Sequence, residues 1–405
     1  TNNNNKALNV PHLRFPEFSG EWNKYTINDL ATVVGGGTPD TTVKSYWGGD
    51  IQWFTPSEIG KNKYVDFSKR TITRDGLDNS SAKLLPLHTI LLSSRATVGE
   101  CSIASNECTT NQGFQSLIAK QCNIDFLYYL IQTKKKDLIR NACGSTFLEI
   151  SANEIRKIKV AVPVQNEQEQ IAKLLSLIDE RIATQNKIIE KLQSLIKGLV
   201  DELMTVLLKG KLYPFSSFYI KAGEGGTPTT SVVEYYTEGT IPFIKIEDLS
   251  CKYLTNNKDF ITELGMQKSS AWLIPSKSVI YSNGATIGAI SINEYPVCTK
   301  QGILGIVPNT NINVEYLYLL MSSSYFSKEI SRIITEGTMK TAYLKDINHI
   351  KCPLPSMAQQ KNITNLTSSI EEKLSIEQEL LRFLNLQKQY LLHLSLIHIS
   401  EPTRP

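Results

Sequence analysis

The run QNEQEQIAKLLSLIDERIATQNKIIEKLQSLIKGLVDELMTVLLK, from Gln165 to Lys209, decides the architecture of this chain. It contains no proline and a single glycine, and Glu, Gln, Lys, Leu and Ile dominate it. Alternating steps of four and three residues reach ten positions, all apolar except Gln185: Ile171, Leu175, Ile178, Ile182, Gln185, Ile189, Leu192, Ile196, Leu199 and Leu203. A heptad pattern of this kind is typical of a coiled-coil seam. It predicts a long helix that packs against a partner helix.

A second seam lies 192 residues further along the chain. The shifted positions are Ile363, Thr367, Ile370, Leu374, Glu377, Leu381, Leu384, Lys388, Leu391 and Ser395, and six of them are apolar. The simplest partner for the first seam is therefore the second, within the same chain. A domain precedes each helix, so antiparallel pairing would place one domain at each end of a rod roughly 60 Å long. The alternative is that each seam packs against a partner subunit.

The rest of the chain is duplicated in the same way. Gly36-Gly37-Thr38-Pro39 recurs as Gly225-Gly226-Thr227-Pro228, and Ala96-Thr97-Val98-Gly99 recurs as Ala285-Thr286-Ile287-Gly288, both 189 residues later. Gln112-Gly113 matches Gln301-Gly302 at the same shift. A period this long indicates repeated whole domains and excludes a solenoid, whose units span roughly 20–50 residues.

Each copy combines short strand-like runs, Gly/Ser/Asn turns and a helix, a pattern that favours an α+β domain. We therefore expect two α+β domains separated by two long antiparallel helices that form an intramolecular coiled coil. The expected boundaries are an N-terminal lead (1–22), a first domain (23–163), a first helix (164–210), a second domain (211–355), a second helix (356–394) and an atypical tail (395–405).

Bulk composition narrows the functional classes. The seven cysteines form no CxxC pair, the five histidines are scattered, and no membrane-length apolar run or secretory signal is present. We therefore expect a cytoplasmic protein without a metal site. The Gly35–Thr38 run continues into Pro39 and Asp40, which excludes a P-loop, and no GxSxG or HExxH motif occurs. No catalytic residue is predicted.

Basic residues interleaved with aromatic residues are the candidates for DNA contact, because such mixtures suit phosphate and base-edge recognition. In the first domain they are Trp47, Lys61, Lys63, Lys69, Arg70, Arg74 and Arg95; in the second they are Lys245, Lys252, Lys258, Lys268 and Asn283. Arg95 and Asn283 lie in turns at matching strand ends, where a base-contacting loop and a purely structural turn are equally good interpretations. Only the first domain is basic overall, and the net charge of the chain is +4.

Leu13-Arg14-Phe15-Pro16-Glu17-Phe18, followed by Gly20-Glu21-Trp22, resembles the opening of specificity subunits of type I restriction-modification enzymes. The paired GGTP segments, the Ala-Thr-[Val/Ile]-Gly turns and the entries to the helices at Pro163 and Pro355 resemble the same family. The second helix departs from the pattern near Leu394, where its heptads end.

The resemblance implies that each domain reads one half of a split site on double-stranded DNA, while the helices set the spacer and dock two methyltransferase subunits. It also implies motor/endonuclease subunits. S-adenosylmethionine, ATP and Mg²⁺ would bind the partner subunits, with no cofactor on this non-catalytic chain. The alternative from another class is a coiled-coil structural adaptor whose domains bind proteins.

Overall fold

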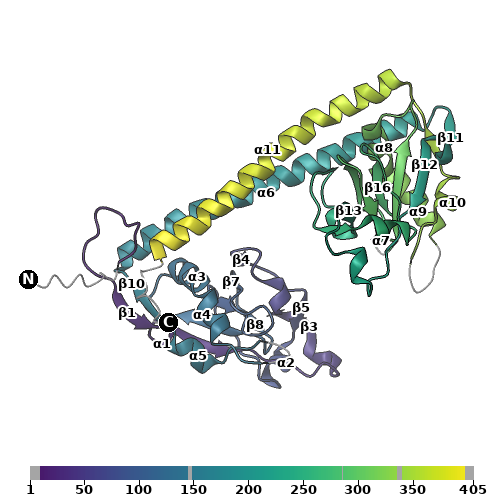
Figure 1. The fold of residues 1–405 in the computed structure, drawn as a ribbon. Helices are drawn as coiled ribbons and strands as arrows, with labels where there is room; N and C mark the ends of the chain where they lie inside the picture. Colours follow the sequence, from purple (N-terminus) through teal and green to yellow (C-terminus); the bar gives the residue numbers. More distant parts are fainter. Residues whose placement is uncertain (1–9, 145–147, 285, 335–339, 397–405) are drawn as a thin grey trace, which may run out of the picture. The chain divides into compact units, whose positions relative to one another are not determined.

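The computed structural model describes residues 10–144, 148–284, 286–334 and 340–396. The chain forms two compact units: one comprises the residues up to Asn186 together with those from Glu379 onward, and the other spans Lys187–Gln378. Each unit contains one α+β domain and parts of both long helices, α6 (Gln165–Leu207) and α11 (Met357–Leu396) (Figure 1).

The first domain begins with a strand that pairs with its last strand. In chain order its elements are β1 (Asn23–Thr26), α1 (Ile27–Leu30), β2 (Ala31–Gly35), η1 (Lys44–Tyr46), β3 (Trp47–Phe54), η2 (Pro56–Glu58), β4 (Tyr64–Val65), β5 (Arg70–Ile72), α2 (Arg74–Asp78), β6 (Ile90–Leu92), β7 (Cys101–Ala104), β8 (Cys108–Thr110), β9 (Gln115–Ala119), α3 (Ile124–Thr133), α4 (Lys135–Arg140), α5 (Ala152–Lys157) and β10 (Lys159–Val162). Among its described residues, one sheet has the order β2-β9-β6-β7-β4, a second has the order β5-β3-β8, and β1 pairs with β10.

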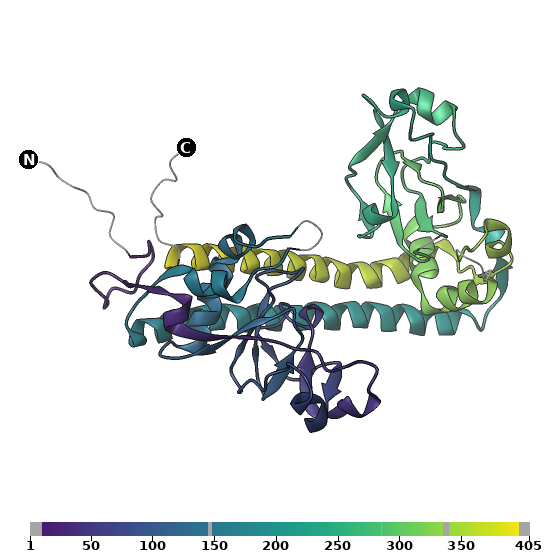
Figure 2. The same ribbon diagram turned by 90° about the horizontal axis from the view of Figure 1, so that it is seen from below.

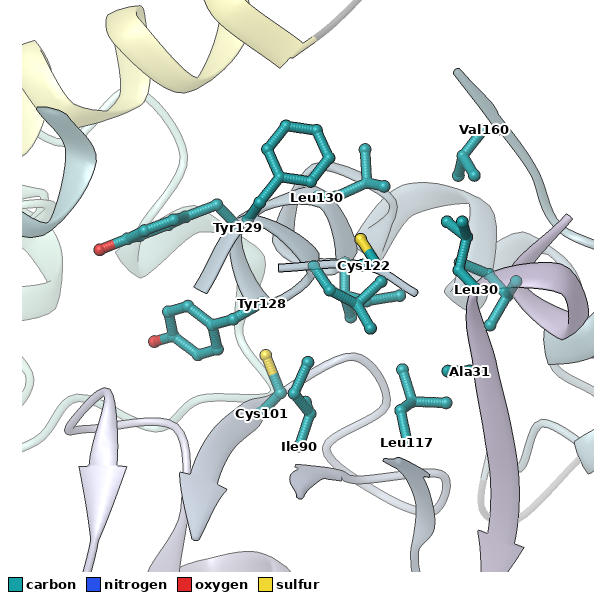
Figure 3. Close-up of a cluster of buried hydrophobic side chains, with 14 of the residues drawn as sticks. Leu30, Ala31, Ile90, Cys101, Leu117, Cys122, Tyr128, Tyr129, Leu130 and Val160 are labelled. Carbon is teal, nitrogen blue, oxygen red and sulfur yellow. The ribbon is translucent and has the colours of Figure 1, made fainter. Parts of the chain in front are cut away.

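The core of the first domain lies between the larger sheet and α3. Ile90 and Leu117 extend from the sheet, and every residue of α3 from Phe126 to Ile131 is buried. Figure 3 shows Tyr128, Tyr129 and Leu130 above these strand residues. Ile171 and Leu175 of α6 belong to the same cluster, so the domain and the start of the helix share one core.

The second domain repeats the first element by element. Its elements are β11 (Leu212–Pro214), η3 (Phe215–Ser217), β12 (Tyr219–Glu224), η4 (Val233–Tyr235), β13 (Ile241–Ile244), η5 (Ile246–Asp248), β14 (Tyr253–Leu254), β15 (Asp259–Ile261), α7 (Glu263–Gln267), β16 (Val279–Ser282), β17 (Ile290–Asn293), β18 (Cys298–Thr299), β19 (Ile303–Pro308), α8 (Val314–Ser322), α9 (Ser324–Ile333), α10 (Leu344–Ile347) and β20 (Lys351–Pro353). Within the described part, the sheet orders β12-β19-β16-β17-β14 and β15-β13-β18 match those of the first domain. The two copies of the sequence therefore fold with the same sheet topology.

Side-chain caps explain why helices begin at the same places in both copies. Asn123 accepts a hydrogen bond from the backbone N–H of Phe126 at the start of α3, and Asn313 caps α8 in the same way. Such caps satisfy backbone donors that the helix itself leaves unpaired, and each stabilises its helix by about 1 kcal/mol.

A glutamine fastens each long helix to its domain. The Gln168 amide donates to the carbonyl of Pro163 (2.9 Å), and its oxygen accepts from the backbone N–H of Asn123 (2.9 Å). Gln360 makes the equivalent bonds to Pro355 and Asn313. The residues that follow each proline in the sequence therefore set the angle at which the helix leaves the domain.

The two long helices pair in antiparallel fashion within each unit. In the first unit, Leu391 and Leu396 near the end of α11 pack on the core that contains Ile171, near the start of α6 (Figures 1 and 2). In the second unit, Ile363 near the start of α11 shares a core with Met204, near the end of α6. Every position of both predicted seams is buried or half-buried. The structure thus confirms two α+β domains joined by an intramolecular coiled coil.

Two expected boundaries differ from the structure. The lead expected at 1–22 joins the first domain from residue 10 onward, because Trp22 is 3% exposed and part of the core. The tail expected from Ser395 begins later, because α11 continues to Leu396, which is 1% exposed. The remaining tail, 397–405, lies outside the described residues. In the described part of the chain, no helix is long and apolar enough to cross a membrane.

Candidate nucleic-acid interface

Three duplicated motifs meet at one end of the larger sheet in the first domain. The backbone N–H of Gly36 donates to the carbonyl of Phe114, and that of Ser94 donates to the carbonyl of Gly113. Thr38 donates its hydroxyl to the side-chain oxygen of Gln112. We call this meeting point, formed by 36–38, 93–99 and 111–114, the motif cluster.

The second domain builds the same cluster and keeps both backbone bonds. Gly225 donates to Ile303 (2.9 Å), and Asn283 donates to Gly302 (3.0 Å). The hydroxyl of Thr227 accepts from the backbone N–H of Gln301 (3.4 Å), whereas that of Thr38 donates to the side chain of Gln112. The motifs that define the sequence repeat therefore define one repeated local structure.

The GGTP segments have a steric role in this cluster. A Cβ atom added to Gly36 would lie 1.9 Å from the carbonyl oxygen of Asn111, and one added to Gly225 would lie 2.1 Å from that of Thr299. Real Cβ atoms do not approach oxygen this closely, so only glycine fits at either position. The backbone N–H groups of Gly36 and Gly37 donate to the carbonyls of Phe114 and Thr110, so these glycines hold the cluster together.

Arg95 occupies the exposed rim of the first motif cluster. Its guanidinium forms a two-point pair with Glu149 (2.8 and 3.0 Å), and the side chains are 44% and 43% exposed. The following residue, Ala96, adopts a φ of 62°, which is uncommon for a residue with a Cβ. The turn is thus both a tight structural turn and the support of an exposed arginine. In the second domain Gly284 stands in its place, and Ala285 lies outside the described residues.

A basic and aromatic cluster adjoins the first motif cluster. The guanidinium carbon of Arg70 lies 3.6 Å from the ring centroid of Trp47 and 5.4 Å from that of Trp53. The indole N–H of Trp53 donates to the carbonyl of Gly37 (2.9 Å), which ties the pair to the GGTP segment. Stacking on an aromatic face fixes the guanidinium plane while its N–H edges remain free to bind phosphate or a base edge.

The second domain carries the opposite charge at the equivalent place. Asp259 stands where the first domain has Arg70, and its carboxylate binds the ammonium group of Lys245 (2.9 Å). This hydrogen bond raises the pKa of Lys245. Lys245 is therefore partly neutralised by its neighbour, and the two domains present different charges on the same scaffold.

Three predicted contact residues point inward. Lys63 and Lys252 have side chains only 11% and 13% exposed, and both are ion-paired with carboxylates of nearby helices. Asn283 is 1% exposed and donates its amide to the carbonyl of Ala342 (3.1 Å). A buried, paired group cannot reach DNA without losing these bonds, so we withdraw these three residues from the candidate set.

The remaining candidates lie at the surface. Lys61, Lys69, Lys258 and Lys268 are exposed, and Arg74 forms only an exposed pair with Asp78 (3.3 Å). Such a pair is worth little in water, so Arg74 remains available to a phosphate group. Sequence reasoning missed Glu149, which orients Arg95. Its only sequence signal is that it is the one carboxylate between Asn141 and Ser151.

A polar cavity of about 770 Å³ lies in the first unit between the β4 edge, α3 and the long helices. Lys63, Asp179 and Lys388 are among its lining residues, and so is Cys101, whose pKa burial raises to about 12. The thiol therefore stays protonated. In the part of the chain that the structure describes, no group of three or more His, Cys, Asp or Glu side chains could hold a metal ion.

Comparison with known families and proteins gives a consistent result. The family model for the type I restriction modification DNA specificity domain matches residues 19–194 and 218–386, once for each copy. The chain is 29% identical over 382 residues to the MjaIX specificity subunit of Methanocaldococcus jannaschii, covering 87% of this chain and 88% of that one. It is 29% identical over 175 residues to the EcoR124I/EcoR124II specificity subunit of Escherichia coli, covering 41% and 43%.

Two solved structures share the fold. The type I restriction-modification S subunit from M. genitalium superposes with a TM-score of 0.53 at 18% identity, covering 96% of this chain and all of that one. A chain from a study of complex assembly and conformational transition in the type I R-M system gives a TM-score of 0.59 at 14% identity, covering 93% and 97%.

Proposed function

The chain belongs to the type I restriction-modification DNA specificity family, and we propose on this premise that each of its domains reads one half of a bipartite DNA site. The proposal rests on one observation: a constant scaffold carries different exposed residues in the two copies. In the alignment of the two copies, Asp259 corresponds to Arg70, and Gly284 corresponds to Arg95. Two readers of different sequences need this combination, because the scaffold sets position and the exposed side chains select bases.

The chemistry is assigned to partner subunits. We propose that this chain is non-catalytic, that two methyltransferase subunits carry S-adenosylmethionine, and that motor/endonuclease subunits carry ATP and Mg²⁺. The adaptor alternative, in which the domains bind proteins, has no support from the family to which the chain belongs.

We propose that the methyltransferase subunits dock on the outer faces of the long helices, where large apolar side chains are exposed. In the first unit, α11 exposes four large apolar side chains: Leu380, Phe383, Leu386 and Tyr390. In the second unit, Leu195 and Val206 of α6 are 55% and 62% exposed. The heptad seam already pairs α6 with α11 within each unit, so these side chains form an additional face. On α11 the four side chains recur every three or four residues, so they share one side of the helix. Exposed apolar surface of this kind marks an interaction site.

Selection from randomised duplexes tests the reading function. The complex of this chain with its methyltransferase subunits is expected to enrich two short motifs at a fixed spacing. Exchange of residues 47–74 for those of a relative should change one motif only. Absence of any enriched sequence would refute the proposal, and a change in both motifs would refute the division between the domains.

Lengthening the coiled coil tests the spacer function. One heptad inserted between Ile182 and Ile189, with a matching heptad between Leu374 and Leu381, adds about 10 Å to each helix and nearly two full turns. The spacer between the motifs is expected to lengthen while their bases stay unchanged. An unchanged spacer would contradict this role of the helices.

A further inference from the structure

Lys63 links three layers of the first unit. It lies just before β4, and its ammonium group binds Asp125 of α3 (2.7 Å) and the hydroxyl of Ser176 in α6 (2.7 Å). Tyr64 donates its hydroxyl to the same Asp125 carboxylate (2.7 Å). One lysine thereby ties the edge of the recognition sheet to a domain helix and to the long helix.

Lys252 makes the same link in the second unit. It stands 189 residues after Lys63, and its ammonium group binds Glu371 of α11 (2.5 Å) and lies 3.8 Å from Glu315 of α8. Tyr253 donates to Glu315 (2.6 Å), as Tyr64 does to Asp125. The carbonyls of both lysines accept a backbone bond from the adjacent strand, from Ile103 and Ile292 respectively (2.7 Å each).

Different residues connect the domain to the long helix in the two units, but the connection is present in both. In the first unit Tyr129 donates to Asp179 of α6 (2.6 Å), and Lys388 of α11 binds the same carboxylate (2.6 Å). Aligned on the caps Asn123 and Asn313, a shift of 190, the second unit has Leu319 in place of Tyr129. Aligned on the helix seams, a shift of 192, it has the longer Glu371 in place of Asp179. The extra methylene of Glu371 lets the carboxylate reach the lysine directly where the tyrosine hydroxyl is missing.

We propose that Lys63 and Lys252 are positioning residues that fix the orientation of each recognition domain on its long helix, and thereby the register between the two half-sites. Three observations carry this inference: the equivalent positions of the lysines in the repeat, their low exposure, and their pairing to a long helix in both units. A flexible surface lysine would show neither the low exposure nor the pairing to a long helix. These cross-links act together with the shared core and the Gln168 and Gln360 bonds in holding each helix against its domain.

The inference rests on the proposed reading function, and the substitution Lys63→Met tests it in the complex with methyltransferase subunits. The substitution retains most of the apolar stem and removes the charge. We expect affinity for the two-part site to fall about tenfold and spacers one base pair longer or shorter to be accepted, with unchanged half-site bases. Lys63→Arg should recover part of the loss, and Lys24→Met, an exposed control in β1, should change nothing.

The salt dependence separates positioning from phosphate contact. A lysine that binds a phosphate contributes about one to the slope of log affinity against log salt. Lys63→Met is expected to leave the slope unchanged, whereas Lys61→Met should reduce its magnitude by about one. If Lys63→Met reduces the magnitude of the slope and still accepts only one spacer length, the inference is overturned. Lys63 would then be a DNA-contacting residue.

A measurement without DNA keeps the inference testable if the wild-type complex selects no sequence. Spin labels at Glu107 in the domain and Lys173 on α6, in a full-length Cys143→Ser, Cys251→Ser background, report the distribution of distances between the two elements. We expect Lys63→Met to broaden it. If that variant fails to fold, Ser176→Ala with Tyr129→Phe removes the bonds to the long helix and the Lys63–Tyr129 bond, but keeps the Lys63–Asp125 pair. An unchanged distribution would overturn the inference.

Discussion

Arg14 and Glu167 lie 153 residues apart in the sequence and form a two-point ion pair, with both N–O distances 2.8 Å. Glu167 is fully buried in the first turn of α6 and also accepts a hydrogen bond from the indole N–H of Trp22 (3.1 Å). The N-terminal segment is thereby fastened to the start of the long helix. This contact explains why that segment belongs to the first domain.

Glu167→Gln is expected to destabilise the first unit by about 3 kcal/mol, because it leaves the Arg14 guanidinium without its counter-charge in a largely buried site. Urea unfolding followed by tryptophan fluorescence measures this, since three of the four tryptophans lie in the first domain. Glu169→Gln, an exposed neighbour on the same helix, is the matched control. Equal unfolding midpoints for the two variants would contradict the structural role of the pair.

Two glycine substitutions should act in opposite directions. Gly36→Ala is expected to destabilise the first domain by at least about 2 kcal/mol, because its Cβ would overlap the Asn111 carbonyl. Gly198→Ala in α6 meets no atom within 4 Å and should stabilise the chain by about 0.5–1 kcal/mol through helix propensity. Thermal unfolding of both variants checks the prediction. A neutral Gly36→Ala would show that the motif cluster can relax.

The thiols should divide into two classes. Cys143 and Cys251 are exposed, whereas the other five cysteines are buried. Burial raises the pKa of Cys101, Cys108 and Cys122 to about 12 and that of Cys298 to about 11, so the reactive thiolate is scarce at pH 8. At pH 8 only the two exposed thiols, Cys143 and Cys251, should be labelled rapidly. Rapid labelling of more than two in the native chain would contradict the burial pattern.

Arg70→Ala should weaken binding of the two-part DNA site by about tenfold, because it removes a charged, pre-oriented donor from the surface of the first domain. Titration of fluorescent duplexes with the methyltransferase complex measures the change. Arg332→Ala, an exposed arginine on α9 of the second domain, is the control. A loss confined to duplexes with an intact first half-site supports Arg70 as a reader; equal affinity for wild type and variant removes it from the candidates.

The sequence alone determined the architecture of this protein. The heptad positions from Ile171 and the 189-residue shift of the GGTP motif predicted the paired helices and the duplicated domains, because periodicity and repetition are local properties of the chain. Family membership also followed from these ordered motifs, and the family match confirms it.

Only the tertiary structure decided which charged residues face solvent. Lys61 and Lys63 are the same residue type only two positions apart. Lys61 is exposed, whereas Lys63 is bound to Asp125 and Ser176. Asn283 looked like a loop residue and is buried. The physical reason is that a lysine's role depends on whether carboxylates from distant helices lie within about 4 Å of it, and that proximity arises only when the domain folds onto its helix.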